Sequence, residues 1–180
     1  MKETVKGKFK VLFVCTGNTC RSPMAEGILK KMLEDKGVGN LEVSSAGTHG
    51  LQNAPASLFA REVAGDRNID LSGHRSCRLT AEMIEDADLI LAMSQEHLDY
   101  IKRIGGTAGH RTFLLKAFRQ VNSASNKGGN EGVLSIDDPI GGSLDDYQRS
   151  FADIEKEIKR ILPELLKSAN KDNFRDTSRS

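Results

Sequence analysis

The sequence lacks long hydrophobic runs and a large net charge, and both shortages exclude classes of protein. No apolar stretch approaches membrane-spanning length, and the basic start, residues 1–10, contains no apolar signal-peptide segment. The formal net charge is only +1 at pH 7, so nothing in the composition indicates nucleic-acid or membrane binding. We therefore expect no nucleic-acid partner and no membrane partner.

Cysteine is also scarce, with three residues in a chain of 180. Two of them lie in one loop, so they do not form the disulfide framework of a small secreted protein. No second ligand pair accompanies Cys15 and Cys20, so we expect no metal site. The length suffices for one globular domain with a sizeable hydrophobic core that needs no disulfide bonds. We expect a monomer in the cytoplasm, where thiols stay reduced.

The most informative stretch combines a buried strand, a short loop and the start of a helix. Residues 11–14 are four apolar residues in a row, a pattern typical of a strand that is buried on both faces. Pro23 suits the first turn of a helix, where its missing N–H is not needed. The N–H groups of the loop between them can converge above the positive end of that helix, which predicts an anion site.

The side chains of this loop indicate which anion binds and what happens to it. Cys15 ends the strand, where the loop donors, the helix dipole and Arg21 should stabilise its thiolate. Ser22 can add a hydroxyl hydrogen bond to that sulfur, and the Arg21 guanidinium can grip two phosphate oxygens at once. Gly17 is expected to relieve the tight turn and Asn18 to pin it. A nucleophile inside an oxyanion cradle predicts phosphoryl transfer to sulfur.

Strand and helix patterns alternate along the rest of the chain, which predicts a parallel sheet covered by helices on both faces. Further strands are predicted over residues 41–46, 89–93 and 111–115. Helices are predicted over residues 22–36, 56–64, 80–86, 94–104 and from 143 to about 165. Ser94 is expected to cap its helix, and Ser143 with Asp146 forms a capping box. Residues 119–136, rich in Ser, Asn and Gly, are expected to form a mobile loop.

Several separate segments resemble the low-molecular-weight protein tyrosine phosphatase family. The first is CTGNTCRSPMAEG at residues 15–27, which carries the spacing Cys-x5-Arg-Ser. The others are Ser45-Ala46-Gly47, residues 74–80, residues 87–93 and Asp137-Asp138-Pro139. They follow the order of the family and cover about residues 9–166, so chance matching is negligible.

The resemblance implies an α/β flavodoxin-like fold with a four-stranded parallel sheet in the order 2-1-3-4 and helices on both faces. A single phosphatase domain is expected at residues 1–168, and the polar residues 169–180 are expected to be a disordered tail. The catalytic residues implied are Cys15, Arg21 and Asp138. The phosphate-binding residues implied are Thr16, Gly17, Asn18, Thr19, Cys20, Arg21 and Ser22.

In the implied mechanism, the Cys15 thiolate attacks phosphorus while Asp138 protonates the leaving atom. Asp138 then activates the water that hydrolyses the phosphocysteine. No cofactor is required, and the partner is a phosphorylated protein substrate. Asp137 is a second acid or a loop carboxylate, and the family pattern favours Asp138.

Two positions bear on the substrate. Family members that act on phosphotyrosine typically have an aliphatic residue where this chain has Thr19, and aromatic residues after Asp-Pro, where it has Ile140. Both departures resemble the bacterial protein-arginine phosphatase branch. A rim hydroxyl suits a polar guanidinium, so we expect phosphoarginine as substrate, with phosphotyrosine as the alternative. A non-catalytic phosphate-binding scaffold and an arsenate reductase are further alternatives, although the latter would want two more cysteines near Cys77.

The remaining candidate residues each have two interpretations. Cys20 forms a reversible redox disulfide with Cys15, or it is a small buried residue that supports the loop. Cys77 is expected to be structural, and core packing is expected for Tyr147. The histidines are expected to lie at the surface or to fix loops rather than act as bases. They are His49, His74, His97 and His110.

Overall fold

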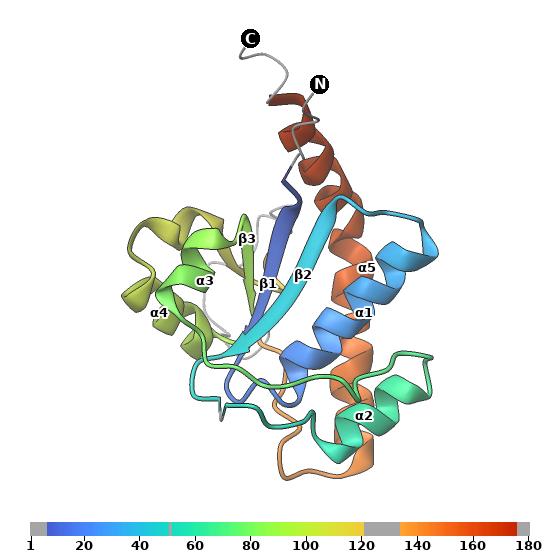
Figure 1. Ribbon diagram of the computed structural model, residues 1–180. Coiled ribbons are helices and arrows are strands. Elements are labelled where there is room, and N and C mark those ends of the chain that lie inside the picture. Colours follow the sequence, from blue (N-terminus) through green and yellow to red (C-terminus); the bar gives the residue numbers. More distant parts are fainter. Residues whose placement is uncertain (1–6, 51, 121–133, 176–180) are drawn as a thin grey trace.

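Four parallel strands form the sheet of this computed structural model, which describes residues 7–50, 52–120 and 134–175. Their order is β2-β1-β3-β4 (Figure 1), which confirms the predicted flavodoxin-like arrangement. The strands are β1 (Phe9–Cys15), β2 (Leu41–Gly47), β3 (Leu89–Ala92) and β4 (Thr112–Leu114).

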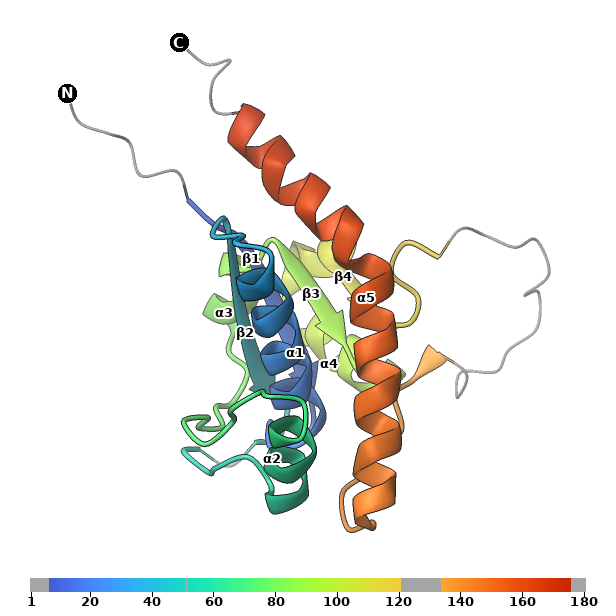
Figure 2. The same cartoon turned by 90° about the vertical axis from the view of Figure 1, so that its right-hand side faces the viewer.

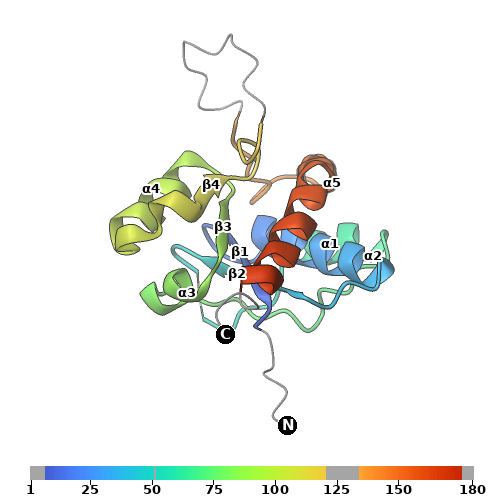
Figure 3. The same ribbon diagram turned by 90° about the horizontal axis from the view of Figure 1, so that it is seen from above.

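Helices cover both faces of the sheet, as the continuous apolar strands require. Alternate residues of β1 enter opposite layers: Val11 and Phe13 belong to one buried cluster, and Leu12 and Val14 to the other. Figure 3 shows α1, α2 and α5 on the first side and α3 and α4 on the second. The helices are α1 (Arg21–Asp35), α2 (Leu58–Gly65), α3 (Ala81–Asp86), α4 (Gln95–Ile104), the 3₁₀ helix η1 (Gly106–Arg111) and α5 (Leu144–Arg175).

The last helix corrects one prediction at the end of the chain. Residues 169–175 are helical rather than a disordered tail, and Ala169 is buried in the same cluster as β1. Figure 2 shows α5 lying along α1 and continuing past the amino end of the sheet. Residues 176–180 lie outside the described residues. The capping box at the start of α5 is confirmed, because the Ser143 N–H donates to Asp146 Oδ2 and the Asp146 N–H donates to Ser143 Oγ.

The segment before the expected acid is only partly described. Residues 121–133 of the predicted loop lie outside the described residues. Ile136, which the prediction included in the loop, is buried, and its N–H donates to the Met93 carbonyl over 2.8 Å. This bond attaches the chain at Ile136 to the end of β3, so it fixes the position from which the segment with the two aspartates starts. In the part of the chain that the structure describes, no helix is both long and apolar enough to cross a membrane.

Candidate active site

Cys15 lies buried at the carboxyl end of β1, where the chain turns into the loop that leads to α1. Its Sγ is 2.9 Å from the Ser22 hydroxyl, and the Asn18 N–H donates to it over 3.3 Å. Both groups can donate to a thiolate, and hydrogen bonds to an ionised acceptor are the stronger ones. The predicted contact between Ser22 and Cys15 is confirmed, and the sulfur sits at the positive end of the α1 dipole.

Asn18 holds the loop in shape through contacts with three separate parts of the chain. Its amide nitrogen donates to Ser22 Oγ over 2.9 Å and to Ser45 Oγ over 2.8 Å, and its amide oxygen accepts the Cys77 N–H over 2.9 Å. His74 Nε2 lies 2.7 Å from the Asn18 carbonyl and donates to it. These bonds confirm that Asn18 pins the turn, and they make His74 a residue that fixes this loop.

The glycine requirement of the loop differs from the prediction. The left-handed backbone belongs to Asn18, with φ of 54°, and not to Gly17. Asparagine is one of the few residues that adopt this conformation readily. The position of the loop instead requires a glycine at Gly47, at the end of β2. A Cβ there would lie 2.6 Å from the Thr16 carbonyl oxygen and 2.9 Å from the Asn18 nitrogen.

Arg21 and Asp138 meet directly, although they are 117 residues apart in the sequence. Arg21 Nη2 donates to Asp138 Oδ2 over 2.5 Å, and Nη1 donates to the Ile136 carbonyl over 3.1 Å. The Arg21 side chain is 5% exposed, whereas that of Asp138 is 37% exposed. The carbonyl therefore fixes a buried guanidinium from one side, and the aspartate reaches it from the more open side.

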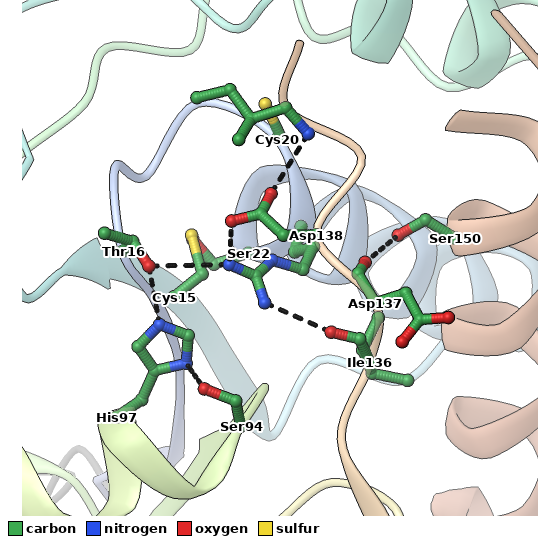
Figure 4. Close-up of polar contacts among 12 residues, drawn as sticks. Cys15, Thr16, Cys20, Ser22, Ser94, His97, Ile136, Asp137, Asp138 and Ser150 are labelled. Atoms are coloured by element: carbon green, nitrogen blue, oxygen red, sulfur yellow. Dashed lines mark hydrogen bonds and ion pairs between the residues drawn. The ribbon is translucent and has the colours of Figure 1, made fainter. Parts of the chain in front are cut away.

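The two neighbouring aspartates point in different directions. Figure 4 shows the Asp138 carboxylate on the side of Cys15 and Thr16, and the Asp137 carboxylate turned away from them. Asp138 Oδ1 also accepts the Ile140 N–H over 3.1 Å, while Asp137 is held through its carbonyl by the Ser150 hydroxyl. The Ile140 side chain itself is 66% exposed. The structure thus brings Asp138, and not Asp137, to the predicted site.

A family model matches the part of the chain that contains all of these residues. Residues 10–173 match the family model described as low molecular weight phosphotyrosine protein phosphatase. The chain belongs to this family. Because the match spans both Cys15 and Asp138, the whole site lies inside the region that defines this phosphatase.

Similar proteins include phosphatases of two specificities. A protein-arginine-phosphatase of Bacillus subtilis (strain 168) is 38% identical over 157 residues, covering 87% of this chain and 97% of that protein. The low molecular weight protein-tyrosine-phosphatase Etp of Escherichia coli (strain K12) is 35% identical over 146 residues, covering 81% and 87%. Among solved structures, a YwlE arginine phosphatase mutant with a phosphorylated active-site serine matches with a TM-score of 0.76 at 35% identity, covering 88% of this chain and 96% of that one. The chain is a protein phosphatase of the low-molecular-weight type.

One more side chain reaches the phosphate loop. His97, on the first turn of α4, is 2% exposed, so of its two predicted roles, at the surface or fixing a loop, the structure favours the second. Its Nε2 is 2.8 Å from Thr16 Oγ1, which also accepts a hydrogen bond from Arg21 Nη2 over 3.4 Å. Its Nδ1 is 2.9 Å from Ser94 Oγ, so Ser94 precedes α4 without capping it through its hydroxyl. No sequence pattern predicts this contact, because Thr16 and His97 are 81 residues apart.

The other two cysteines of the phosphatase have different surroundings. The Cys20 thiol is buried 3.3 Å from the Tyr147 hydroxyl and 3.4 Å from that of Ser57. Burial, and next the hydrogen bond to Cys20, raise the pKa of Tyr147 to about 12, so its hydroxyl keeps its proton. Tyr147 packs in the core, as predicted. Burial, and secondly Glu26, raise the pKa of the Cys77 thiol, which donates to the Ser45 carbonyl and is suited to a structural role.

A cleft of about 370 Å³ opens beside Arg21. It is lined by Thr16, Arg21, Ser94, Gln95, Glu96, Ser135, Ile136, Asp137 and Asp138. Three of these residues are acidic and none is aromatic. Within the described ranges, no group of three or more His, Cys, Asp or Glu residues is arranged to hold a metal ion.

Proposed function

We propose that this phosphatase hydrolyses phosphoarginine on proteins through a phosphocysteine formed at Cys15. The observation that carries the proposal is the convergence of the Cys15 thiol, the Arg21 guanidinium and the Asp138 carboxylate at one end of the sheet. A protein that only bound phosphate would need neither the nucleophile nor the acid. Their joint presence therefore supports catalysis over a binding scaffold.

In the first step the Cys15 thiolate attacks phosphorus, and an S–P bond forms as the P–N bond of phosphoarginine breaks. Arg21 and the loop N–H groups hold the equatorial oxygens of the transferring group, where charge must be stabilised. Asp138, protonated for this step, gives its proton to the leaving guanidino nitrogen. This step leaves an unmodified arginine side chain in the substrate protein and an ionised Asp138.

In the second step water attacks the phosphocysteine, and the S–P bond breaks. Asp138 accepts a proton from that water, so inorganic phosphate leaves and the acid regains its proton. Ser22, 2.9 Å from the sulfur, is placed to stabilise the departing thiolate. The phosphorylated active-site serine of the similar YwlE mutant supports a covalent intermediate of this kind.

The lining of the cleft supports a guanidinium over a phenyl ring as the group that carries phosphate. Glu96, Asp137 and Asp138 give this wall a negative charge suited to a cation, and no aromatic residue lines it for stacking. Thr19 adds a hydroxyl to the phosphate loop, with Oγ1 3.6 Å from Cys20 Sγ. The 38% identity to a protein-arginine-phosphatase agrees with this choice.

Phosphotyrosine is the second candidate, because the relative from Escherichia coli is a protein-tyrosine-phosphatase of nearly equal identity. The two substrates differ in the atom that leaves, a nitrogen or a phenolic oxygen. They also differ in shape, since a phenyl ring needs apolar walls that a guanidinium does not. Specificity therefore depends on the rim of the site rather than on its catalytic centre.

The test is phosphate release from peptides that differ only in carrying phosphoarginine or phosphotyrosine. We expect the wild type to prefer phosphoarginine and Thr19→Ile to reduce or invert that preference. Thr19→Ser keeps the hydroxyl and should keep the preference, which separates polarity from bulk. A wild-type preference for phosphotyrosine would overturn the arginine assignment, and undiminished phosphate release by Cys15→Ser would overturn the phosphocysteine.

A further inference from the structure

The contacts of His97 connect α4 to the phosphate-binding arginine through one hydroxyl. Thr16 Oγ1 receives Arg21 Nη2 on one side and lies 2.8 Å from His97 Nε2 on the other (Figure 4). With Asp138 also on Nη2 and the Ile136 carbonyl on Nη1, the guanidinium has contacts on several sides. Of these, the Thr16 and Ile136 contacts come from the walls of the site and do not depend on the exposed acid.

The way Ser94 is used indicates that the position of the His97 ring matters. Serine at the residue before a helix normally accepts an N–H from the first turn, which stabilises the helix. The Ser94 hydroxyl makes no such bond and contacts His97 Nδ1 over 2.9 Å instead. With both ring nitrogens bonded, the imidazole cannot rotate without breaking a buried hydrogen bond.

The charge state of the ring fits a role in positioning. Burial lowers the pKa of His97 to about 4, with smaller contributions from the nearby Arg21 and His49. The N-terminus of α4 also disfavours a cation at this place. A neutral imidazole bonds Thr16 in either tautomer, and in both cases the Thr16 oxygen keeps a lone pair for Arg21.

We propose that His97 is a positioning residue that holds the Thr16 hydroxyl against Arg21 and so sets the guanidinium for the phosphate group. It touches neither Cys15 nor the expected path of the leaving group, so it acts through Thr16. The proposal rests on phosphate binding by the proposed phosphatase site and not on which amino acid carries the phosphate.

Two substitutions separate the two ring contacts. His97→Gln places an amide atom as many bonds from Cα as Nε2, within reach of Thr16. His97→Asn places one as far as Nδ1, so it keeps the Ser94 contact and loses Thr16. We expect His97→Asn to weaken binding of inorganic phosphate, measured by calorimetry, about tenfold. We expect His97→Gln to bind nearly as well as the wild type.

Kinetics with para-nitrophenyl phosphate then show where the loss falls. The loss in His97→Asn should lie mainly in KM, because Arg21 holds the phosphate oxygens throughout the reaction. Thr16→Val removes the same hydroxyl contact, so its effect and that of His97→Asn should not add in the double variant. Ile101→Val, also buried on α4, tests whether a less stable helix alone lowers phosphate affinity, and should leave it unchanged.

Equal phosphate affinity in the Asn and Gln variants, or full additivity with Thr16→Val, would overturn the positioning role. If phosphoarginine peptides prove inert, the calorimetry with inorganic phosphate still tests His97. The failure of the proposed substrate and the failure of this inference therefore give different results.

Discussion

The phosphate side and the acid side of the active site are held by different kinds of contact. On the phosphate side, the buried Asn18 side chain bonds Ser45 and Cys77, which are 27 and 59 residues away. On the acid side, Asp138 bonds the N–H of Ile140, two residues on, and the Arg21 side chain. The cradle for the phosphate is therefore built into the core, whereas the Asp138 carboxylate is held by one local hydrogen bond and one ion pair.

This difference matches the tasks of the two sides. Stabilising the charge of a transferring phosphoryl group requires donors that are already in place, because reorganising them during the reaction would raise the barrier. The acid has to reach a leaving atom in one step and a water molecule in the next. A partly exposed carboxylate suits that task, and each variant below acts on one side only.

The largest effect is expected from Asn18→Ala, which removes the contacts that hold the phosphate side. Alanine at this left-handed φ costs about 1–2 kcal/mol. The Cys77 N–H also loses its partner, at about 1–3 kcal/mol. Because a shift of about 1 Å in reacting geometry can cost 100-fold, we expect kcat/KM to fall at least about that much. Urea unfolding and steady-state kinetics measure the two losses.

Asn68→Ala is the matched control, since Asn68 also has a left-handed φ, of 58°, but lies exposed. It should lose about 1–2 kcal/mol of stability for the same backbone reason and keep wild-type kcat/KM. Comparable loss of activity in both variants would mean that the side-chain contacts of Asn18 do not position the loop for catalysis.

The next largest effect is expected from Asp138→Asn on the acid side. Loss of a general acid typically costs about 100-fold or more, so phosphoenzyme formation should slow by that factor with substrates that have poor leaving groups. Rapid-quench measurement of the phosphoenzyme reports this step directly. With an aryl phosphate, which carries no cation for the acidic wall to bind, Asp137→Asn should remain near the wild-type rate, because its carboxylate points away from that of Asp138. An unchanged rate in Asp138→Asn would remove Asp138 from the acid role.

Burial of His97 on the phosphate side predicts that the free energy of unfolding depends on pH. Its pKa in the folded protein is about 4 and its ordinary value is 6.5, so between these pH values the unfolded chain binds more protons. Stability therefore falls as the pH falls from 6.5 toward 4, by on the order of 3 kcal/mol for this group. Denaturation of wild type and His97→Gln from pH 7 to pH 4 isolates the contribution, which should vanish in the variant. Parallel curves for the two proteins would contradict it.

The smallest effect is expected from Ser143→Ala at the start of α5, just after the acid loop. The serine caps the helix and contacts Asp146, and its hydrogen bonds hold the pKa of Asp146 below the ordinary value. Loss of the cap should cost about 1 kcal/mol in thermal or urea unfolding, with kcat little changed. Ser143→Thr keeps the hydroxyl and should keep the stability. An equal loss of stability in Ser143→Thr would show that the capping hydroxyl does not stabilise the start of α5.

Sequence patterns predicted the sheet and the central residues well. The run before Cys15 marks a buried strand, and the alternation of strand and helix patterns predicts a parallel sheet. The order 2-1-3-4, which the structure confirms, is implied by the family resemblance. The meeting of Arg21 with Asp138 followed from the family resemblance, because no periodicity connects residues so far apart.

The errors of sequence reasoning have a common physical origin in tertiary contacts. His97 bonds Thr16, which is 81 residues away in the sequence, and the loop needs Gly47 because β2 lies against it. At the chain end, the one small apolar residue Ala169 among polar neighbours gave too weak a stripe to predict that the helix continues. Composition describes a segment alone, and these outcomes depend on what packs against it.

The ion pair between Arg21 and Asp138 means that the guanidinium already has an anionic partner before any phosphate arrives. Binding of a phosphate group at Arg21 is therefore an exchange of one oxyanion for another rather than a gain of a new contact. The contribution of Arg21 to phosphate affinity is the difference between two charge-assisted bonds, so it is smaller than its bond to phosphate alone. After hydrolysis the same exchange runs backward: once Asp138 has released the proton that it took from water, its carboxylate competes with inorganic phosphate for Arg21 and assists its departure.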